Sequence, residues 1–209
     1  SPVTQQVSET SADSTPAPSA DGLRVLVVED EALIRLDLTE MLTEEGYVVA
    51  GEAADGEQAV ELARSLRPDL VIMDVKMPKV DGIAAAASIV EERIAPVVML
   101  TAFSQRDLIE QARDAGAMAY LVKPFARHEL VPAIELAVSR FAERRALEDE
   151  VATLTDRLET RKLVHRAKGL LMKERGMSED EAYKRLRSMA MERGIKLVEA
   201  ARRVIDVMS

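Results

Sequence analysis

Short apolar runs alternate along residues 23–125 with segments whose apolar positions recur every three or four residues. The apolar runs are nearly continuous and rich in β-branched residues, which is typical of strands buried on both faces of a sheet. The predicted strands are 23–28, 47–53, 69–74, 96–101 and 119–122. The predicted helices are 31–45, 56–66, 82–93 and 105–115, with a further one from 126.

This alternation predicts right-handed βαβ units and therefore a parallel sheet. Five units in about 120 residues fit the flavodoxin-like doubly wound α/β fold, whose strand order is 2-1-3-4-5. In such a sheet, ligands bind beyond the carboxyl ends of the strands.

The helix that starts near residue 126 has no clear end. Neither proline nor glycine occurs between Pro132 and Gly169. Apolar residues recur there at spacings of four, three and four, which is the pattern of a short heptad seam. These residues are Leu147, Val151, Leu154 and Leu158. The seam fits two interpretations equally, a homodimer contact or packing within the chain.

The end of the chain shows three short amphipathic helical patterns, which predict an all-α domain joined to the α/β domain by a long helix. The first pattern stops near Gly176, which suits a helix C-terminus. Ser178 and Glu181 then form a capping-box pattern at the start of the second, and Gly194 ends it. Helices this short must pack on each other or on the preceding domain.

The net charge changes sign between the predicted α/β part of the chain and the predicted helical part. Residues 1–149 carry 14 basic and 27 acidic side chains, a net charge of −13, whereas residues 150–209 carry 14 and 10, a net charge of +4. An acidic first part and a basic second part indicate different partners, although a charged run can also be a solvated face.

Composition excludes several classes of protein. The chain has no cysteine, so it has neither a disulfide framework nor a thiolate metal site. No apolar run approaches a membrane span, and residues 1–21, rich in Ser, Thr and Pro, lack the features of a signal peptide. We therefore expect a disordered leader, a cytoplasmic protein and no membrane contact.

Polar residues follow four of the predicted strands. Glu29 and Asp30 end the first strand, Asp74 the third, Thr101 the fourth and Lys123 the fifth. Three carboxylates in one crevice repel each other, and a hard divalent cation such as Mg²⁺ would offset the repulsion. Asp74 could then act as a nucleophile towards phosphorus, with Lys123 and Thr101 supporting the phosphoryl oxygens.

The motifs VVEDE, IMDVKMPKVDG, MLTA and AYLVKPF resemble those of bacterial receiver domains. The resemblance implies phosphorylation of Asp74 by a sensor histidine kinase and no enzymatic activity beyond the receiver's own phosphoryl transfer and dephosphorylation. It also implies Asp30, Asp74 and the main-chain carbonyl of Lys76 as Mg²⁺ ligands, with Glu29 acting nearby. Thr101 and Tyr120 would be the switch pair, and the bond from Lys123 to Pro124 would be cis.

Three basic residues and a glycine form a stripe beside the apolar face of the first C-terminal helix, at spacings of four, three and four: Lys162, Arg166, Gly169 and Lys173. Tyr183 and Arg187, four residues apart on the next helix, could stack an unpaired base. The alternative interpretation is ordinary solvent exposure of the cations and a place for Tyr183 at the edge of the core.

The spaced motifs AKGLLM, SEDEAY and KLVEAARRVI resemble the ANTAR domain, the RNA-binding module of transcription antitermination regulators. The resemblance implies binding to RNA hairpins of nascent transcripts. It adds Lys168 to the candidate RNA contacts, which are Lys162, Arg166, Lys168, Lys173, Tyr183 and Arg187. The expected organisation is a leader (1–21), a receiver (22–140), a helical linker or short coiled coil (141–160) and an ANTAR domain (161–209).

Three other functions compete with RNA binding. A DNA-binding response regulator is the main alternative, but the last helix is mostly apolar and resembles core more than a recognition helix. A phosphotransfer protein using His165 is disfavoured because only cations flank that histidine. The third is an adaptor that binds proteins alone.

Overall fold

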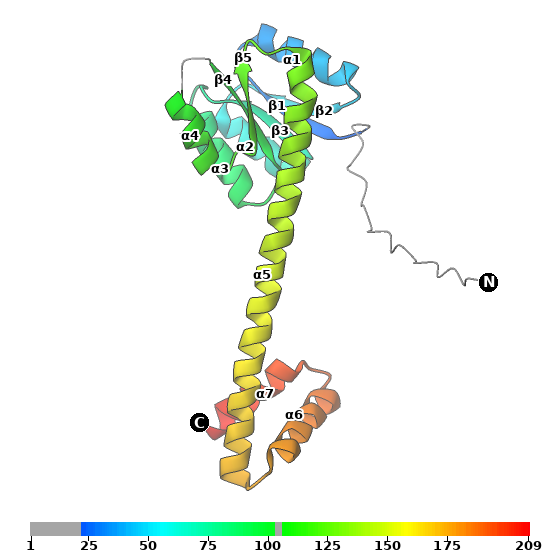
Figure 1. Ribbon diagram of the computed structural model, residues 1–209, viewed down its shortest axis with the longest axis vertical. Helices are drawn as coiled ribbons and strands as arrows, with labels where there is room; N and C mark the ends of the chain where they lie inside the picture. The colour runs from blue at the N-terminus through cyan, green and yellow to red at the C-terminus, as the bar shows by residue number, and fades with distance from the viewer. Residues whose placement is uncertain (1–21, 103–105) are drawn as a thin grey trace, which may run out of the picture. The chain divides into compact units, whose positions relative to one another are not determined.

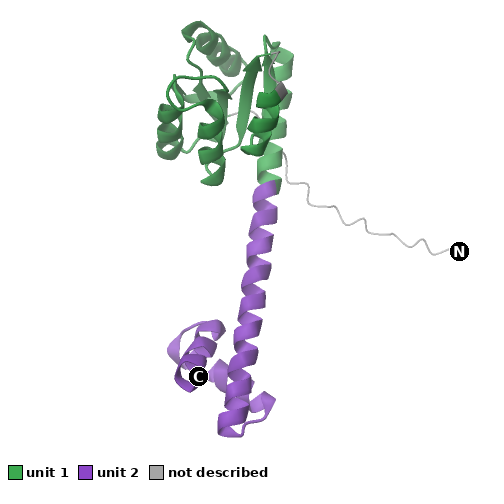
Figure 2. Cartoon of the chain, turned by 90° about the vertical axis from the view of Figure 1, so that its left-hand side faces the viewer, with its two compact units in different colours: residues 1–143 green, residues 144–209 purple. Residues whose placement is uncertain are grey.

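A computed structural model describes residues 22–102 and 106–209 and divides the chain into two compact units. The receiver unit spans residues 1–143 and the C-terminal unit spans residues 144–209 (Figure 2). The predicted leader, residues 1–21, lies outside the described residues.

The receiver unit is built on a five-stranded parallel sheet of order β2-β1-β3-β4-β5 (Figure 1), which confirms the predicted fold class. The predicted strands agree with the observed ones to within about one residue. The strands are β1 (Arg24–Val28), β2 (Val48–Ala53), β3 (Leu70–Asp74), β4 (Val97–Ala102) and β5 (Ala119–Lys123).

Helices cover both faces of this sheet, so its central strand β3 is buried at every position. Two apolar clusters form, one under α2, α3 and α4 and the other under α1 and the first part of α5. Asp55 and Asp81 cap α2 and α3 through their side chains. The helices are α1 (Ala32–Glu44), α2 (Gly56–Leu66), α3 (Gly82–Glu91), α4 (Arg106–Asp114) and α5 (Arg127–Arg175).

The C-terminal unit packs the last part of α5 against α6 (Glu179–Arg193) and α7 (Leu197–Met208). Ser178 and Glu181 make both hydrogen bonds of the predicted capping box, and Gly194 ends α6 in the left-handed region, with φ of 61°. The helix predicted from residue 126, the predicted linker helix and the first C-terminal helix form one helix of 49 residues. It continues because no residue between them breaks the helical hydrogen bonding.

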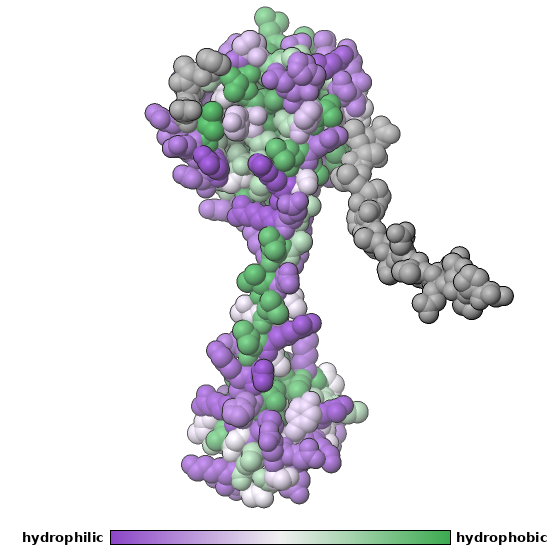
Figure 3. Space-filling view, viewed as in Figure 1, coloured by the Kyte–Doolittle hydropathy of each residue, from purple (hydrophilic) through white to green (hydrophobic). Residues whose placement is uncertain are grey.

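The middle of α5 carries an exposed apolar stripe (Figure 3), formed by Leu147, Val151, Leu154 and Leu158. Between 50% and 62% of the surface of each residue is accessible. Within the part of the chain that the structure describes, the four residues are therefore not covered by packing, and the homodimer interpretation of the seam stays a prediction.

Candidate functional site

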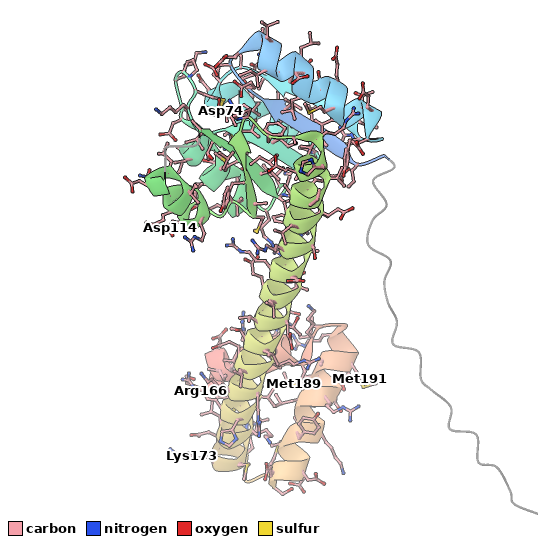
Figure 4. All side chains as sticks on the ribbon, turned by 45° about the horizontal axis from the view of Figure 1, so that its top comes forward. Asp74, Asp114, Arg166, Lys173, Met189 and Met191 are labelled. Carbon is pink, nitrogen blue, oxygen red and sulfur yellow. The ribbon has the colours of Figure 1, made fainter. Side chains whose placement is uncertain are left out.

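The polar residues that end β1, β3, β4 and β5 lie at one edge of the receiver sheet, because parallel strands place their carboxyl ends together. Asp74 is the last residue of β3 (Figure 4), next to β1 and β4 in the sheet. Its neighbours in the chain are apolar and buried, so the sheet holds the carboxylate in a fixed position at its edge.

Lys123 joins two of the carboxylates. Its Nζ atom lies 2.7 Å from Asp74 Oδ2 and 2.8 Å from Glu29 Oε2. Glu29 is fully buried and Asp74 nearly so, whereas Lys123 is partly exposed. Charge-assisted hydrogen bonds in such surroundings hold all three side chains in place.

The environment changes the proton affinity of these groups. Burial raises the pKa of Glu29 to about 7; the hydrogen bond from Lys123 opposes this shift and the negative charge of Asp74 adds to it. Burial lowers the pKa of Lys123, but its hydrogen bonds to Asp74 and Glu29 outweigh burial, so the net direction is upward. The lysine therefore stays cationic beside the two acids.

Asp30 completes an acidic cluster with Glu29 and Asp74. One carboxylate oxygen from each of the three residues lies within 4.8 Å of the other two. Asp30 is exposed, so the cluster opens to solvent on its side. Hard oxygen donors at this spacing suit a divalent cation such as Mg²⁺, which keeps part of its water shell.

Other predicted site residues surround this cluster. The backbone N–H of Lys76 donates to Asp74 Oδ1 at 3.3 Å, while the role of its carbonyl as a metal ligand stays a prediction. Thr101 is 1% exposed, and its hydroxyl has no hydrogen-bond partner among the described residues. Tyr120 is 52% exposed on β5. The peptide bond from Lys123 to Pro124 is cis, as the resemblance implied.

Gly82 is a contributor that the sequence analysis missed. A Cβ atom at this position would lie 1.9 Å from the carbonyl oxygen of Asp74, so only glycine allows α3 to start this close to β3. The backbone N–H of Gly82 also donates to the carbonyl of Val75 at 2.9 Å. Its place at the end of the motif IMDVKMPKVDG was the available signal.

In the C-terminal unit, Lys168 and Tyr183 come together. Lys168 Nζ lies 5.9 Å from the centroid of the Tyr183 ring, within reach of a cation–π contact, and 3.0 Å from Glu179 Oε1. The ion pair lowers the pKa of Glu179. Lys162, His165 and Lys168 also line a hollow of about 470 Å³ beside Glu179.

The remaining candidate RNA contacts are solvent-exposed. Lys162, Arg166 and Lys173 occupy an exposed face of α5 (Figure 4 labels the last two). No side chain lies near Gly169, so the stripe has open space at its centre. Arg187 is exposed on α6, four residues after Tyr183. The structure thus brings Lys168 and Tyr183 together and leaves the others as separate surface cations.

Two known families match the chain, one within the receiver unit and the other within the C-terminal unit. Residues 25–135 match the response regulator receiver domain, and residues 152–205 match the ANTAR domain. The protein is a two-component response regulator that controls transcription. Within that class, the chain belongs to the family that joins a receiver domain to an ANTAR domain.

Two curated relatives illustrate the match. The transcriptional regulatory protein PdtaR of Mycobacterium tuberculosis is 63% identical over 195 residues, which cover 93% of this chain and 95% of the relative. The chemotaxis protein CheY of Thermotoga maritima is 40% identical over 114 residues, which cover 54% of this chain and 95% of the relative. The second match is confined to about half of the chain.

Solved structures resemble the receiver unit. The receiver domain of the response regulator NarL from Mycobacterium tuberculosis has a TM-score of 0.54 and 30% identity, covering 57% of this chain and 98% of that one. The receiver domain of the sensor histidine kinase PA1611 from Pseudomonas aeruginosa has a TM-score of 0.51 and 34% identity, covering 56% and 98%. That structure contains a magnesium ion coordinated in its active-site cleft. In this chain, no helix of the described residues is long and apolar enough to cross a membrane.

Proposed function

We propose that the receiver unit accepts a phosphoryl group from a sensor histidine kinase on Asp74, and that this modification controls RNA binding and transcription antitermination by the ANTAR domain. The observation that carries the first part is the geometry at Asp74. Its carboxylate is held 2.7 Å from the Lys123 ammonium and clustered with two further carboxylates at the edge of the sheet.

Phosphoryl transfer at this site follows from the roles of the chain's own residues. An Asp74 oxygen attacks the phosphorus atom of the donor phosphohistidine, and the bond between phosphorus and the histidine nitrogen breaks. Lys123 offsets the charge of the transferred group, and the unpartnered Thr101 hydroxyl hydrogen-bonds one of its oxygens. The receiver's chemistry is limited to this transfer and the later hydrolysis of the acyl phosphate.

The acidic cluster fits a Mg²⁺ ion, because three carboxylates converge on one point and one of them opens to solvent. Asp30, Asp74 and the Lys76 carbonyl would hold the ion directly, with Glu29 acting through water. When bound, Mg²⁺ supplies positive charge that offsets the phosphoryl oxygens and the carboxylates.

RNA binding is supported by the ANTAR match and by the positive charge of residues 150–209. The Lys168–Tyr183 pair offers a cation beside an exposed aromatic residue, which suits an unpaired nucleotide of a hairpin. Lys162, Arg166, Lys173 and Arg187 would add phosphate contacts. We assign the receiver to 22–140, the linker to 141–160 and the ANTAR domain to 161–209. We also assign the exposed stripe on α5 to a homodimer contact formed on phosphorylation.

A labelling experiment tests the phosphorylation step. Acetyl phosphate with Mg²⁺ should add one phosphoryl group to the wild-type protein and none to Asp74→Asn, as measured by intact mass. Asp114→Asn is the matched control, because Asp114 is an exposed carboxylate at the end of α4 (Figure 4) and should leave labelling unchanged. Undiminished labelling of Asp74→Asn would refute the site assignment.

RNA binding requires a separate measurement. Phosphorylated protein should bind stem-loop RNA more tightly than duplex DNA of matched length at the same salt concentration. The candidate contacts suit unpaired bases, whereas a DNA-binding protein reads base edges in the major groove of the duplex. Sequence-specific binding to duplex DNA with no binding to hairpins would replace this proposal with a DNA-binding response regulator. The phosphorylation result would stand in that case.

A further inference from the structure

Four arginines surround a hollow of about 410 Å³ in the C-terminal unit. They come from all three helices: Arg175 from the end of α5, Arg185 and Arg193 from α6, and Arg203 from α7. All four are exposed, and none forms an ion pair within the part of the chain that the structure describes. This surface, which we call the arginine groove, therefore carries an excess of positive charge.

The floor of the arginine groove is apolar. Met177, Met189 and Met208 line it and are partly buried, and Val207 at its edge is 84% exposed. Asp206 is the one acidic residue in the lining. A floor of flexible, polarizable methionine side chains adapts to a flat apolar ligand surface.

The groove lies on a different part of α6 from the Lys168–Tyr183 pair. Arg185, Met189 and Arg193 follow each other at spacings of four along one side of the helix. Tyr183 is two residues out of phase with Arg185, which corresponds to a rotation of about 200° around a helix. The hollow beside Lys168 shares no lining residue with the arginine groove, so the two are separate surfaces.

The choice of side chains indicates the chemistry of the ligand. All the cations in the lining are arginines, and a guanidinium can bind a phosphate through two hydrogen bonds or stack on a base, whereas a lysine offers only a point charge. The apolar floor suits the face of a nucleobase. An unpaired nucleotide presents both features, a flat apolar base and flanking anionic phosphates.

We propose that the arginine groove binds an unpaired nucleotide of a hairpin RNA, with the base on the methionine floor and the adjacent phosphates held by the arginines. This inference rests on the proposed RNA-binding function and assigns it a second contact surface. Charge complementarity favours a polyanion, because four arginines face one acidic residue in a unit that is basic overall. An acidic peptide is the other ligand that such a groove could take, and the test below separates the two.

The first test compares two double variants of the full-length protein, phosphorylated with acetyl phosphate and Mg²⁺. Arg185→Gln/Arg203→Gln removes two cations from the groove. Lys184→Gln/Arg202→Gln removes two exposed cations from the same two helices outside the groove. The probe is a pool of stem-loop RNAs with one stem and a randomised loop, enriched on the wild-type protein.

We expect the groove variant to bind the enriched stem-loops at least about tenfold more weakly, because two charge-assisted contacts to phosphate are lost. Its salt dependence should also fall by roughly one unit for each lost phosphate contact. The control variant should lose far less affinity and should retain its preference for stem-loops over fully paired RNA of the same length.

A second pair of variants tests the floor. Met189→Gln places a polar group on the floor, whereas Met191→Gln changes a residue two positions along the same helix that is 78% exposed and outside the lining (Figure 4). With 2-aminopurine in the loop, binding to Met191→Gln should change the fluorescence as it does for the wild type. Met189→Gln should reduce that change. Thermal unfolding of each methionine variant shows whether the fold is kept. The double variant Arg185→Gln/Arg203→Gln changes only exposed side chains, so its result stands without this check.

Each outcome of these experiments decides one claim. If the wild type binds stem-loops and the groove variant binds them equally well, the groove assignment is wrong and the RNA-binding function stands. Equal weakening by both double variants would also overturn it, since the contacts would then be spread over the surface. If the wild type binds no stem-loop RNA, the proposed function fails and this inference fails with it. Loss of binding to an acidic amphipathic peptide with unchanged RNA binding would assign the groove to a protein partner.

Discussion

The three carboxylates at the edge of the receiver sheet differ in exposure, and this difference separates their roles. Glu29 is fully buried and paired with Lys123, and Asp74 is nearly buried and paired with the same lysine. Asp30 is exposed, and no ion pair involving it is found among the described residues. It is therefore the carboxylate that gains most from a bound cation.

We predict that Asp30→Asn loses Mg²⁺ binding and labelling by acetyl phosphate while keeping its fold. The substitution removes one charged oxygen donor from an exposed position, so the core is not disturbed. Titration calorimetry with Mg²⁺ and intact-mass analysis measure the two losses. Glu40→Gln, an exposed acidic position on α1, is the control and should behave as the wild type. Labelling of Asp30→Asn at the wild-type rate would show that this residue is not a ligand.

Gly82 leads to a prediction about stability. In Gly82→Ala the new Cβ would overlap the Asp74 carbonyl oxygen, so β3 and α3 must separate. We expect the free energy of unfolding to fall by about 1–3 kcal/mol, as for overpacked sites, and labelling of Asp74 to slow.

Gly169→Ala is the matched comparison, because no atom beyond its chain neighbours and the local helix backbone lies within 4 Å of the new Cβ. Replacing a glycine inside a helix should there raise the free energy of unfolding by roughly 0.5–1 kcal/mol. Urea unfolding of both variants gives the two values. If both substitutions changed the free energy of unfolding by the same amount in the same direction, the close packing of Gly82 against Asp74 would not explain the effect of Gly82→Ala.

Among the secondary-structure elements, α5 leads to a prediction about the oligomeric state. Its exposed stripe at Leu147, Val151, Leu154 and Leu158 has heptad spacing, and no other described residue covers it. We predict that the phosphorylated protein forms a dimer through this stripe and that Leu147→Asn/Leu154→Asn weakens the dimer. Because both positions are exposed, unfolding of the monomer should change by no more than about 0.5 kcal/mol for each substitution.

Analytical ultracentrifugation with and without acetyl phosphate measures the dimer. Ala152→Asn/Thr155→Asn changes two exposed positions of the same helical segment outside the stripe and is the control. The seam assignment fails if the phosphorylated protein stays monomeric. It also fails if the two double variants dimerise alike.

Elements with a strong local pattern could be predicted from the sequence. The three inner strands β1, β3 and β4 are apolar runs that are buried almost throughout, so their positions follow from hydrophobicity alone, whereas the edge strands β2 and β5 are only partly buried. The acidic site was also predictable, since a doubly wound sheet places its strand ends together and only a few polar residues occur there. The boundary inside α5 was not, because neither a cap nor a helix-breaking residue marks a division between linker and output domain.

The arginine groove shows why other features could not be predicted. Arg175, Arg185, Arg193 and Arg203 come from three helices and share no local motif, so only the packing of the helices brings them together. The close approach of Gly82 to Asp74 likewise depends on how α3 starts against β3. Neither feature could be predicted from the sequence, because helical periodicity indicates which residues share one face of a helix but does not determine how two elements pack against each other.

At the level of the whole molecule, charge is divided between the two parts of the chain. Residues 1–149 carry a net charge of −13 and residues 150–209 a net charge of +4. An acidic receiver repels RNA, so a polyanion is attracted only by the basic part. RNA affinity should therefore depend strongly on salt.

Phosphate contacts and base contacts to RNA should differ in their dependence on salt. Changing Lys162, Arg166 and Lys173 together to Ala in the phosphorylated protein should weaken RNA binding. It should also reduce the slope of log affinity against log salt by somewhat under one unit for each lost contact, because fewer counterions are released. Tyr183→Ala should instead lose about 1–3 kcal/mol of binding free energy with little change in slope, since stacking releases no counterions. Filter binding to a stem-loop at several salt concentrations measures both. An unchanged slope in the triple variant would show that the three cations Lys162, Arg166 and Lys173 are a solvated face and that RNA is held elsewhere on the C-terminal unit.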